Sequence, residues 1–200
     1  HLLRQVCLSL EEAHARGISV YDVCNEKVAS LGAAGAASDI IFHPYLFGSD
    51  VQPTARAGFY GLGAWHTKAH LLRALYEGVV YGHMHHIAKL RAAGASMDCA
   101  RLTGGGSHSH VWTQMFADAL QLPVEVPEGA EVAARGAAMA AGVGAGVYRD
   151  YPSAVAGCVA VERVHQPDPG AASFYRSRYA EFVNILDAMK EPWNRLAQLS

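Results

Sequence analysis

The sequence predicts an α/β fold, and two observations lead to this prediction. After residue 98, strand-like apolar runs and helical patterns alternate in the order strand, helix, strand, helix, which favours a parallel pair of strands. In addition, 51% of the 200 residues are hydrophobic and only 17% are charged, a composition that supports a buried core. The length suffices for one large domain or for one and a half small ones.

The charge and the cysteine content exclude several classes of protein. A formal net charge of -2 gives no basic face, so we expect no nucleic-acid partner. No apolar run is long enough to span a bilayer, so we expect no membrane partner. Four cysteines without a CxxC pair indicate unpaired thiols and a cytoplasmic protein: Cys7, Cys24, Cys99 and Cys158.

The first half of the chain is predicted to combine helices with two short strands. Two helices, a Gly/Ala/Ser loop and two strands are expected in this order: 1–16, 20–31, 32–38, 40–42 and 58–62. The longest helical pattern then runs from about Thr67 to Ala93. Thr67 is a suitable N-cap residue, and Gly94 is placed to end the helix.

The second half alternates strands and helices. A strand at 99–102 leads into Thr103-Gly104-Gly105-Gly106, and a helix is predicted from about Ser107 to Leu120. A further strand and two helices are expected at 123–127, 133–145 and 173–190. The predicted elements divide the chain into four segments. Residues 1–38 are a helical lead-in, and residues 39–97 hold a strand pair and the long helix. Residues 98–150 form a strand-GGG-helix-strand-helix segment, and residues 151–200 are C-terminal helices.

The most informative local feature is the glycine run Gly104, Gly105 and Gly106 between a strand and a helix. Glycines let the backbone approach a ligand, and the helix N-terminus behind them offers free N–H groups and a positive dipole end. This arrangement suits a nucleotide, although a flexible turn between strand and helix would give the same pattern. No P-loop GK[ST] sequence is present.

Histidines are frequent on the long helix and after the glycine run: His83, His85, His86, His108 and His110. His83 and His86 are three residues apart and could share a metal ion. No nearby carboxylate or cysteine completes a ligand set, so ordinary polar histidines are the simpler interpretation. A metal-dependent enzyme remains as a weaker alternative, and no metal ligand is assigned.

Two stretches together resemble the FGGY family of carbohydrate kinases. Residues 57–62 read AGFYGL, and HLLRALYE follows seven residues later at 70–77, which resembles the C-terminal signature of the family at every specified position. TGGGS at 103–107 resembles the adenosine loop. The residues behind it resemble the helix and strand that follow this loop and the helix that closes the nucleotide cleft: Trp112, Gln114, Ala117, Asp118, Pro123, Val124 and 136–138. The likeness extends from about residue 40 to about residue 190.

This resemblance implies an actin/hexokinase-like (ribonuclease H-like) ATPase fold, with sugar and MgATP in a cleft between two domains. It implies that ATP and Mg²⁺ are the cofactors and that the γ-phosphoryl group passes to a ketopentose. It places Gly104, Gly105 and Gly106 against the nucleotide, while Ser109 matches a contact position where Asn is often found. Residues 42–49 and 65–66 look most like the xylulose kinases, particularly their L-xylulose branch.

The resemblance also implies that the catalytic base is not in this chain. The catalytic aspartate of the family precedes the region that residue 1 represents, and Asp39, Asp50 and Asp118 do not match it. We therefore expect a part of a kinase that is inactive alone. A non-catalytic nucleotide-binding or interaction module on the same fold is the alternative, and a homodimer is compatible with both. Glu77 and Arg56 match family positions that we interpret as structural.

Overall fold

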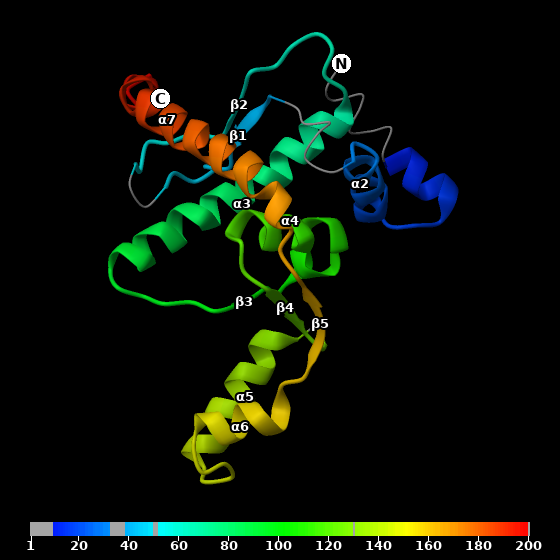
Figure 1. Cartoon of the computed structure of the whole chain (residues 1–200), viewed down its shortest axis with the longest axis vertical. Coiled ribbons are helices and arrows are strands. Elements are labelled where there is room, and N and C mark those ends of the chain that lie inside the picture. The colour runs from blue at the N-terminus through cyan, green and yellow to red at the C-terminus, as the bar shows by residue number, and fades with distance from the viewer. Residues whose placement is uncertain (1–9, 33–38, 50–51, 130, 200) are drawn as a thin grey trace. The chain divides into compact units, whose positions relative to one another are not determined.

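The computed structural model describes residues 10–32, 39–49, 52–129 and 131–199. The chain forms two compact units, called unit 1 and unit 2 below (Figure 1). Unit 1 comprises His1–Ser96 and Asp168–Ser200, and unit 2 comprises Met97–Pro167. Each unit combines helices with a small sheet, as the α/β prediction requires.

Unit 1 contains a two-stranded antiparallel sheet. Strand β1 (Ile41–His43) pairs with β2 (Gly58–Tyr60), and Phe42 lies opposite Phe59. Both strands were predicted. Pro44 follows β1 directly and cannot donate a ladder hydrogen bond, which explains why the strand is short.

The helices before this sheet agree with the prediction where the structure describes them. Residues 10–16 are helical, and α2 (Val20–Ala29) begins after Ser19, whose hydroxyl accepts a hydrogen bond from the backbone N–H of Tyr21. The first nine residues of the predicted lead-in helix and most of the predicted loop, residues 33–38, lie outside the described residues.

Helix α3 (Lys68–Ala92) confirms the longest predicted helix. The backbone N–H of Thr67 donates to Nδ1 of His70 at 3.0 Å, which satisfies one of the free donors at the helix N-terminus. Lys89 and Arg91 lie in the last turn, where their positive charges interact favourably with the negative end of the helix dipole. Gly94 follows with φ +91°, the left-handed conformation that ends many helices.

A buried ion-pair network joins α3 to the last helix, α7 (Ala172–Ala197). The side chain of Glu77 is 1% exposed, and its Oε1 lies 2.7 Å from Nε of Arg73 while its Oε2 lies 3.2 Å from Nε of Arg178. The two guanidinium groups also donate to backbone carbonyls, that of Arg73 to Gly32 and that of Arg178 to Ile40. A buried carboxylate needs such partners, so this position supports the structural interpretation of Glu77.

Helix α7 is longer than predicted. The sequence predicts its end near Lys190, ahead of Pro192, but the helix continues through Pro192 to Ala197. Proline removes a helical hydrogen bond and normally breaks a helix. Here Trp193, only 2% exposed, packs in a cluster with Ala55 and Leu186, and this burial stabilises the last turns. The predicted boundary was therefore wrong.

Unit 2 is built on a three-stranded sheet in the order β3-β4-β5. Strands β3 (Ala100–Arg101) and β4 (Val124–Pro127) are parallel, with Ala100 opposite Val124, as the sequence predicted. Strand β5 (Val161–His165) was not predicted, and it lies antiparallel to β4 with Arg163 opposite Val126.

The helices of unit 2 differ from the prediction at two places. Helix α4 (His110–Leu120) begins three residues after the predicted start at Ser107, because a 3-10 helix, η2 (Gly105–His108), precedes it. Helix α5 (Val132–Gly144) was predicted, whereas α6 (Tyr151–Cys158) was not. Asp150 caps α6 by accepting a hydrogen bond from the backbone N–H of Ser153 at 2.8 Å.

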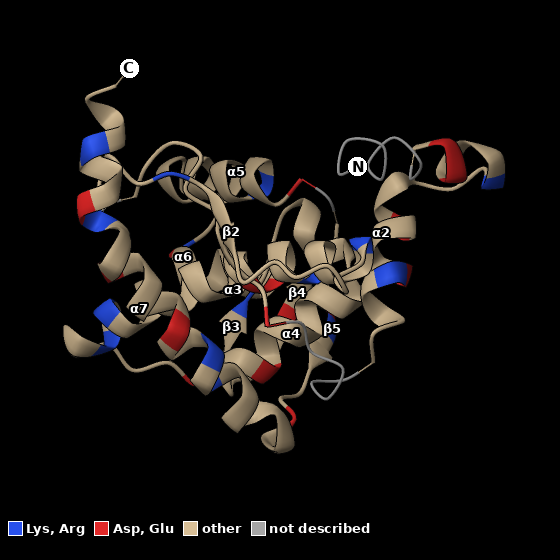
Figure 2. Ribbon diagram, turned by 90° about the horizontal axis from the view of Figure 1, so that it is seen from above, with Lys and Arg blue, Asp and Glu red and all other residues tan. Residues whose placement is uncertain are grey.

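Acidic and basic residues are mixed along the ribbon rather than gathered by sign, as α7 shows in Figure 2. This distribution agrees with a formal net charge of -2. Among the described residues, no helix combines the length and the apolar character needed to cross a membrane.

Candidate functional site

The glycine turn, defined as Gly104–Gly106, follows β3 in unit 2. Gly104 has φ +83° and reverses the chain into η2, which begins at Gly105. The first N–H groups of such a turn have no partner within it, so those of Gly105 and Gly106 lie at its free end. Gly104 and Gly105 are exposed. The turn therefore presents backbone donors on the surface of unit 2.

The three glycines differ in what a side chain would meet. A Cβ atom at Gly105 would find no other atom within 4 Å, and Gly105 does not have a positive φ. A Cβ atom at Gly106 would lie 3.0 Å from the ring of Trp112. The left-handed backbone conformation of the turn belongs to Gly104. A Cβ atom at Gly104 would also find no other atom within 4 Å, but its positive φ would strain any side chain. Gly105 is thus the glycine of the turn that is open to a ligand and free of backbone strain.

Ser109 is the N-cap residue of α4. Its Oγ accepts a hydrogen bond from the backbone N–H of Trp112 at 3.1 Å, and the side chain is buried. The hydroxyl therefore satisfies one of the free donors of the helix. Any contact of Ser109 with a nucleotide would compete with this cap.

The histidines on α3 and beside the glycine turn do not form a metal site in the described part of the chain. His83, His86, His108 and His110 are exposed. No three His, Cys, Asp or Glu side chains among the described residues lie close enough together to hold a metal ion. The metal-dependent alternative therefore gains no support from the geometry.

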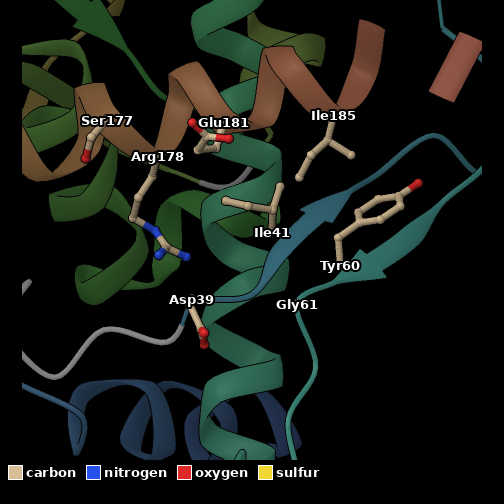
Figure 3. Close-up of a pocket in the computed structure, with 8 residues that line it drawn as sticks. All are labelled: Asp39, Ile41, Tyr60, Gly61, Ser177, Arg178, Glu181 and Ile185. Atoms are coloured by element: carbon tan, nitrogen blue, oxygen red, sulfur yellow. The ribbon is translucent and has the colours of Figure 1, made fainter. Parts of the chain in front are cut away.

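A pocket of about 350 Å³ opens in unit 1 beside β1, β2 and α7 (Figure 3). Sequence analysis did not identify it. Nε2 of His66 donates to the carboxylate of Asp39 at 2.7 Å, because Nδ1 of His66 accepts the backbone N–H of Gly63. The guanidinium of Arg178 is bound to Glu77. Asp39 and Arg178, two charged residues that line the pocket, are thus each paired with another residue of unit 1.

Comparison with known proteins identifies a family. The model of the FGGY family of carbohydrate kinases, C-terminal domain, matches residues 1–145. The chain is 41% identical over 170 residues to the L-xylulose/3-keto-L-gulonate kinase of Escherichia coli (strain K12), covering 85% of this chain and 34% of that protein. It is 31% identical over 192 residues to a gluconokinase of Bacillus licheniformis, covering 94% of this chain and 37% of that protein.

Solved structures agree with these relatives. The xylulose kinase from Rhodospirillum rubrum superposes with a TM-score of 0.80 at 29% identity, over 96% of this chain and 38% of that chain. The chain thus spans between 34% and 38% of the length of these three relatives.

Proposed function

Because this chain belongs to the FGGY family of carbohydrate kinases, as their C-terminal domain, we propose that it supplies the nucleotide side of an ATP-dependent sugar kinase. The resemblance seen in the sequence is confirmed by the family match, and the actin/hexokinase-like ATPase fold by the likeness to the R. rubrum kinase. The reaction of the whole protein is the transfer of the γ-phosphoryl group of MgATP to a hydroxyl group of a sugar.

The observation that carries this proposal is the open backbone at Gly105. A nucleotide needs a surface that its base, ribose or phosphates can approach closely, and Gly105 has no chain atom in front of its missing side chain. The free N–H groups at the start of η2 can donate to an anionic or carbonyl oxygen there. In phosphoryl transfer the protein acts mainly by positioning, so a nucleotide-holding turn is a direct contribution.

We propose a ketopentose such as xylulose as the sugar substrate. The support is the relative at 41% identity, whose name includes L-xylulose, and the xylulose kinase with a TM-score of 0.80. Mg²⁺ belongs to the proposal because it neutralises the phosphate charge of ATP during transfer. The described residues offer no cluster of metal ligands, so no residue of this chain is assigned to Mg²⁺.

The cytoplasm is the proposed location. The three cysteines that the structure describes, Cys24, Cys99 and Cys158, are free thiols, the state that a reducing compartment maintains. A homodimer stays compatible with the proposal.

The test is Gly105→Val in the full-length kinase. We expect the KM for ATP to rise about tenfold or more, because the branched side chain fills the space in front of the turn; tenfold corresponds to about 1.4 kcal/mol if KM follows binding. The KM for the sugar should stay within about twofold, since the turn is assigned to the nucleotide alone. Steady-state kinetics and a thermal melt give both quantities.

Two further glycine variants make this test specific. Gly157→Val also places a side chain where no atom lies within 4 Å, but on α6, so it should leave the KM for ATP unchanged. Gly104→Ala strains the backbone, so it should lower the melting temperature. An unchanged KM for ATP in well-folded Gly105→Val protein would remove the glycine turn from the nucleotide site.

A further inference from the structure

Ser107 sets the position of the glycine turn from inside. It is 6% exposed, and both its backbone N–H and its Oγ donate to the carbonyl of Gly104, at 3.0 Å and 2.7 Å. These two bonds close the chain around Gly105 and Gly106. Any displacement of Ser107 therefore moves the backbone that faces the proposed nucleotide.

The carbonyl oxygen of Ser107 is held in turn by Arg163, 56 residues later in the chain. Nη2 of Arg163 donates to this carbonyl, and Oγ1 of Thr113 approaches it at 3.4 Å. Arg163 lies on β5, in register with Val126 of β4. A hydrogen bond from a charged guanidinium is about twice as strong as a neutral one, so Arg163 is the stronger of the two donors to Ser107.

The guanidinium of Arg163 is itself oriented by a directed chain of hydrogen bonds. Its Nε donates to Nε2 of His165 at 3.3 Å, because arginine has no acceptor. Nδ1 of His165 then carries the proton and donates to Oε1 of Gln114 at 3.0 Å. The amide nitrogen of Gln114 donates to Asp118 at 2.7 Å. All donors run in one direction and end on a carboxylate, so each group has a fixed orientation.

Arg163 lies beyond the residues that the family model matches, which end at 145. Its side chain is 17% exposed, and it also forms an ion pair with the exposed Glu162 at 3.2 Å. An arginine on an edge strand would normally point into water. This one is directed instead at a buried carbonyl beneath the glycine turn.

We infer that Arg163 is a positioning residue for the nucleotide: through Ser107 it holds the glycine turn in the conformation that binds ATP. The inference rests on the proposed function, because it assumes that the turn contacts the nucleotide. Arg163 acts on the protein backbone and has no assigned contact with ATP or with the sugar.

The kinetic test uses Arg163→Gln and Arg163→Lys in the full-length kinase. Arg163→Gln should raise the KM for ATP about three- to tenfold, as expected for partial loss of one charge-assisted hydrogen bond, and leave the KM for the sugar unchanged. Arg163→Lys keeps a charged donor and should restore part of the affinity. Arg149→Gln is the matched control, because Arg149 is 86% exposed and pairs only with its neighbour Asp150 in the described ion pairs.

A second measurement does not depend on activity. Amide hydrogen exchange in the full-length protein should become faster in peptides covering 103–110 for Arg163→Gln, and should stay unchanged there for Arg149→Gln. Unchanged exchange in Arg163→Gln would overturn the role of Arg163, even if the KM for ATP rose. A KM effect in Gly105→Val without one in Arg163→Gln would also overturn it while leaving the proposed function intact. If neither variant changed the KM for ATP, the proposed function would fail, and the exchange result would still decide whether Arg163 holds the turn.

Discussion

Gly104, Gly105 and Gly106 are adjacent, but the physical constraints on a side chain differ among them. Gly104 has a positive φ, which an L side chain adopts only with strain. Gly106 lies against the indole of Trp112, so a Cβ atom at this position would be only 3.0 Å from the nearest ring atom. Gly105 has neither constraint. Because the chain itself tolerates a side chain at Gly105, any effect of Gly105→Val on ATP measures the ligand rather than the fold.

His43 is a second residue whose environment has measurable consequences. It is fully buried on β1, and its Nε2 donates to the carbonyl of Phe182 at 2.9 Å, while Nδ1 has no hydrogen-bond partner. Burial lowers the pKa of His43, and the carbonyl of Phe182 opposes this shift only partly. Four aromatic rings surround the imidazole: Tyr45, Tyr60, Phe182 and Trp193.

The lowered pKa predicts that acid destabilises the protein through His43. Above a pH of about 6.5 the imidazole is neutral in both states, so the group adds no pH dependence. As the pH falls from about 6.5 towards the lower pKa of the folded state, His43 becomes protonated in the unfolded chain but stays neutral in the folded one. The free energy of unfolding then falls, by up to about 1.4 kcal/mol per pH unit for one proton.

His43→Phe keeps an aromatic ring in this position and removes the titration. We expect the variant to lose less stability than the parent between pH 7 and pH 5, measured by urea unfolding at both values. At pH 7 it should be less stable by about 1 kcal/mol, because the carbonyl of Phe182 loses its donor. Equal pH dependence in His43→Phe and the parent would contradict the prediction.

Some elements could be predicted from the sequence because their signals are local. Helix α3 combines a cap residue, 25 residues of helical pattern and a terminal glycine, and its predicted limits agree with the structure within one residue. The parallel pair of β3 and β4 follows from the order of strand and helix patterns alone. In these cases propensity, capping and burial favour the same structure.

Other elements could not be predicted because tertiary contacts decide them. Strand β5 carries Glu162, Arg163 and His165 in five residues, a polar pattern that does not resemble a buried strand. Helix α7 passes Pro192 because Trp193 is buried, which no local rule indicates. For the same reason only the glycine part of the candidate site could be predicted from the sequence. The glycines are visible in the sequence, whereas Arg163 reaches them only through the fold.

The network between α3 and α7 is expected to be the most sensitive polar contact in unit 1. Glu77→Gln keeps the shape of the side chain but removes the carboxylate that pairs with the buried guanidinium groups of Arg73 and Arg178. Breaking a buried pair in this way costs about 3–5 kcal/mol of unfolding free energy. Urea unfolding at neutral pH measures the loss.

The control for Glu77→Gln is the exposed pair of Asp187 and Lys190 on α7. Its two atoms are 2.7 Å apart, but the side chains are 60% and 46% exposed. Water screens such a pair, so Asp187→Asn should cost about 1 kcal/mol or less. If both variants lost the same stability, the pairing around Glu77 would not be a main support of the contact between α3 and α7.

The molecule as a whole has features that fit a part of a larger protein. In the described residues, β3 and β5 form the two edges of the sheet in unit 2, and their outer backbone groups can accept another strand. Large apolar side chains are exposed in unit 1, with Phe47 at 99% and Trp65 at 72%. Edges and apolar side chains of this kind favour association with further chain segments.

The last prediction concerns the 200 residues expressed alone. Of these, 170 residues align with 34% of the E. coli L-xylulose/3-keto-L-gulonate kinase. Phosphoryl transfer requires the nucleotide, the sugar and the base to be positioned together. We therefore expect the isolated chain to show no sugar-dependent ATP consumption with ketopentoses, while the full-length protein turns over at about 1–10³ per second. A coupled assay on both proteins, at equal concentration, measures this difference. Turnover by the isolated chain at an ordinary rate would show that it carries a complete active site, and an inactive full-length protein would favour the non-catalytic module instead.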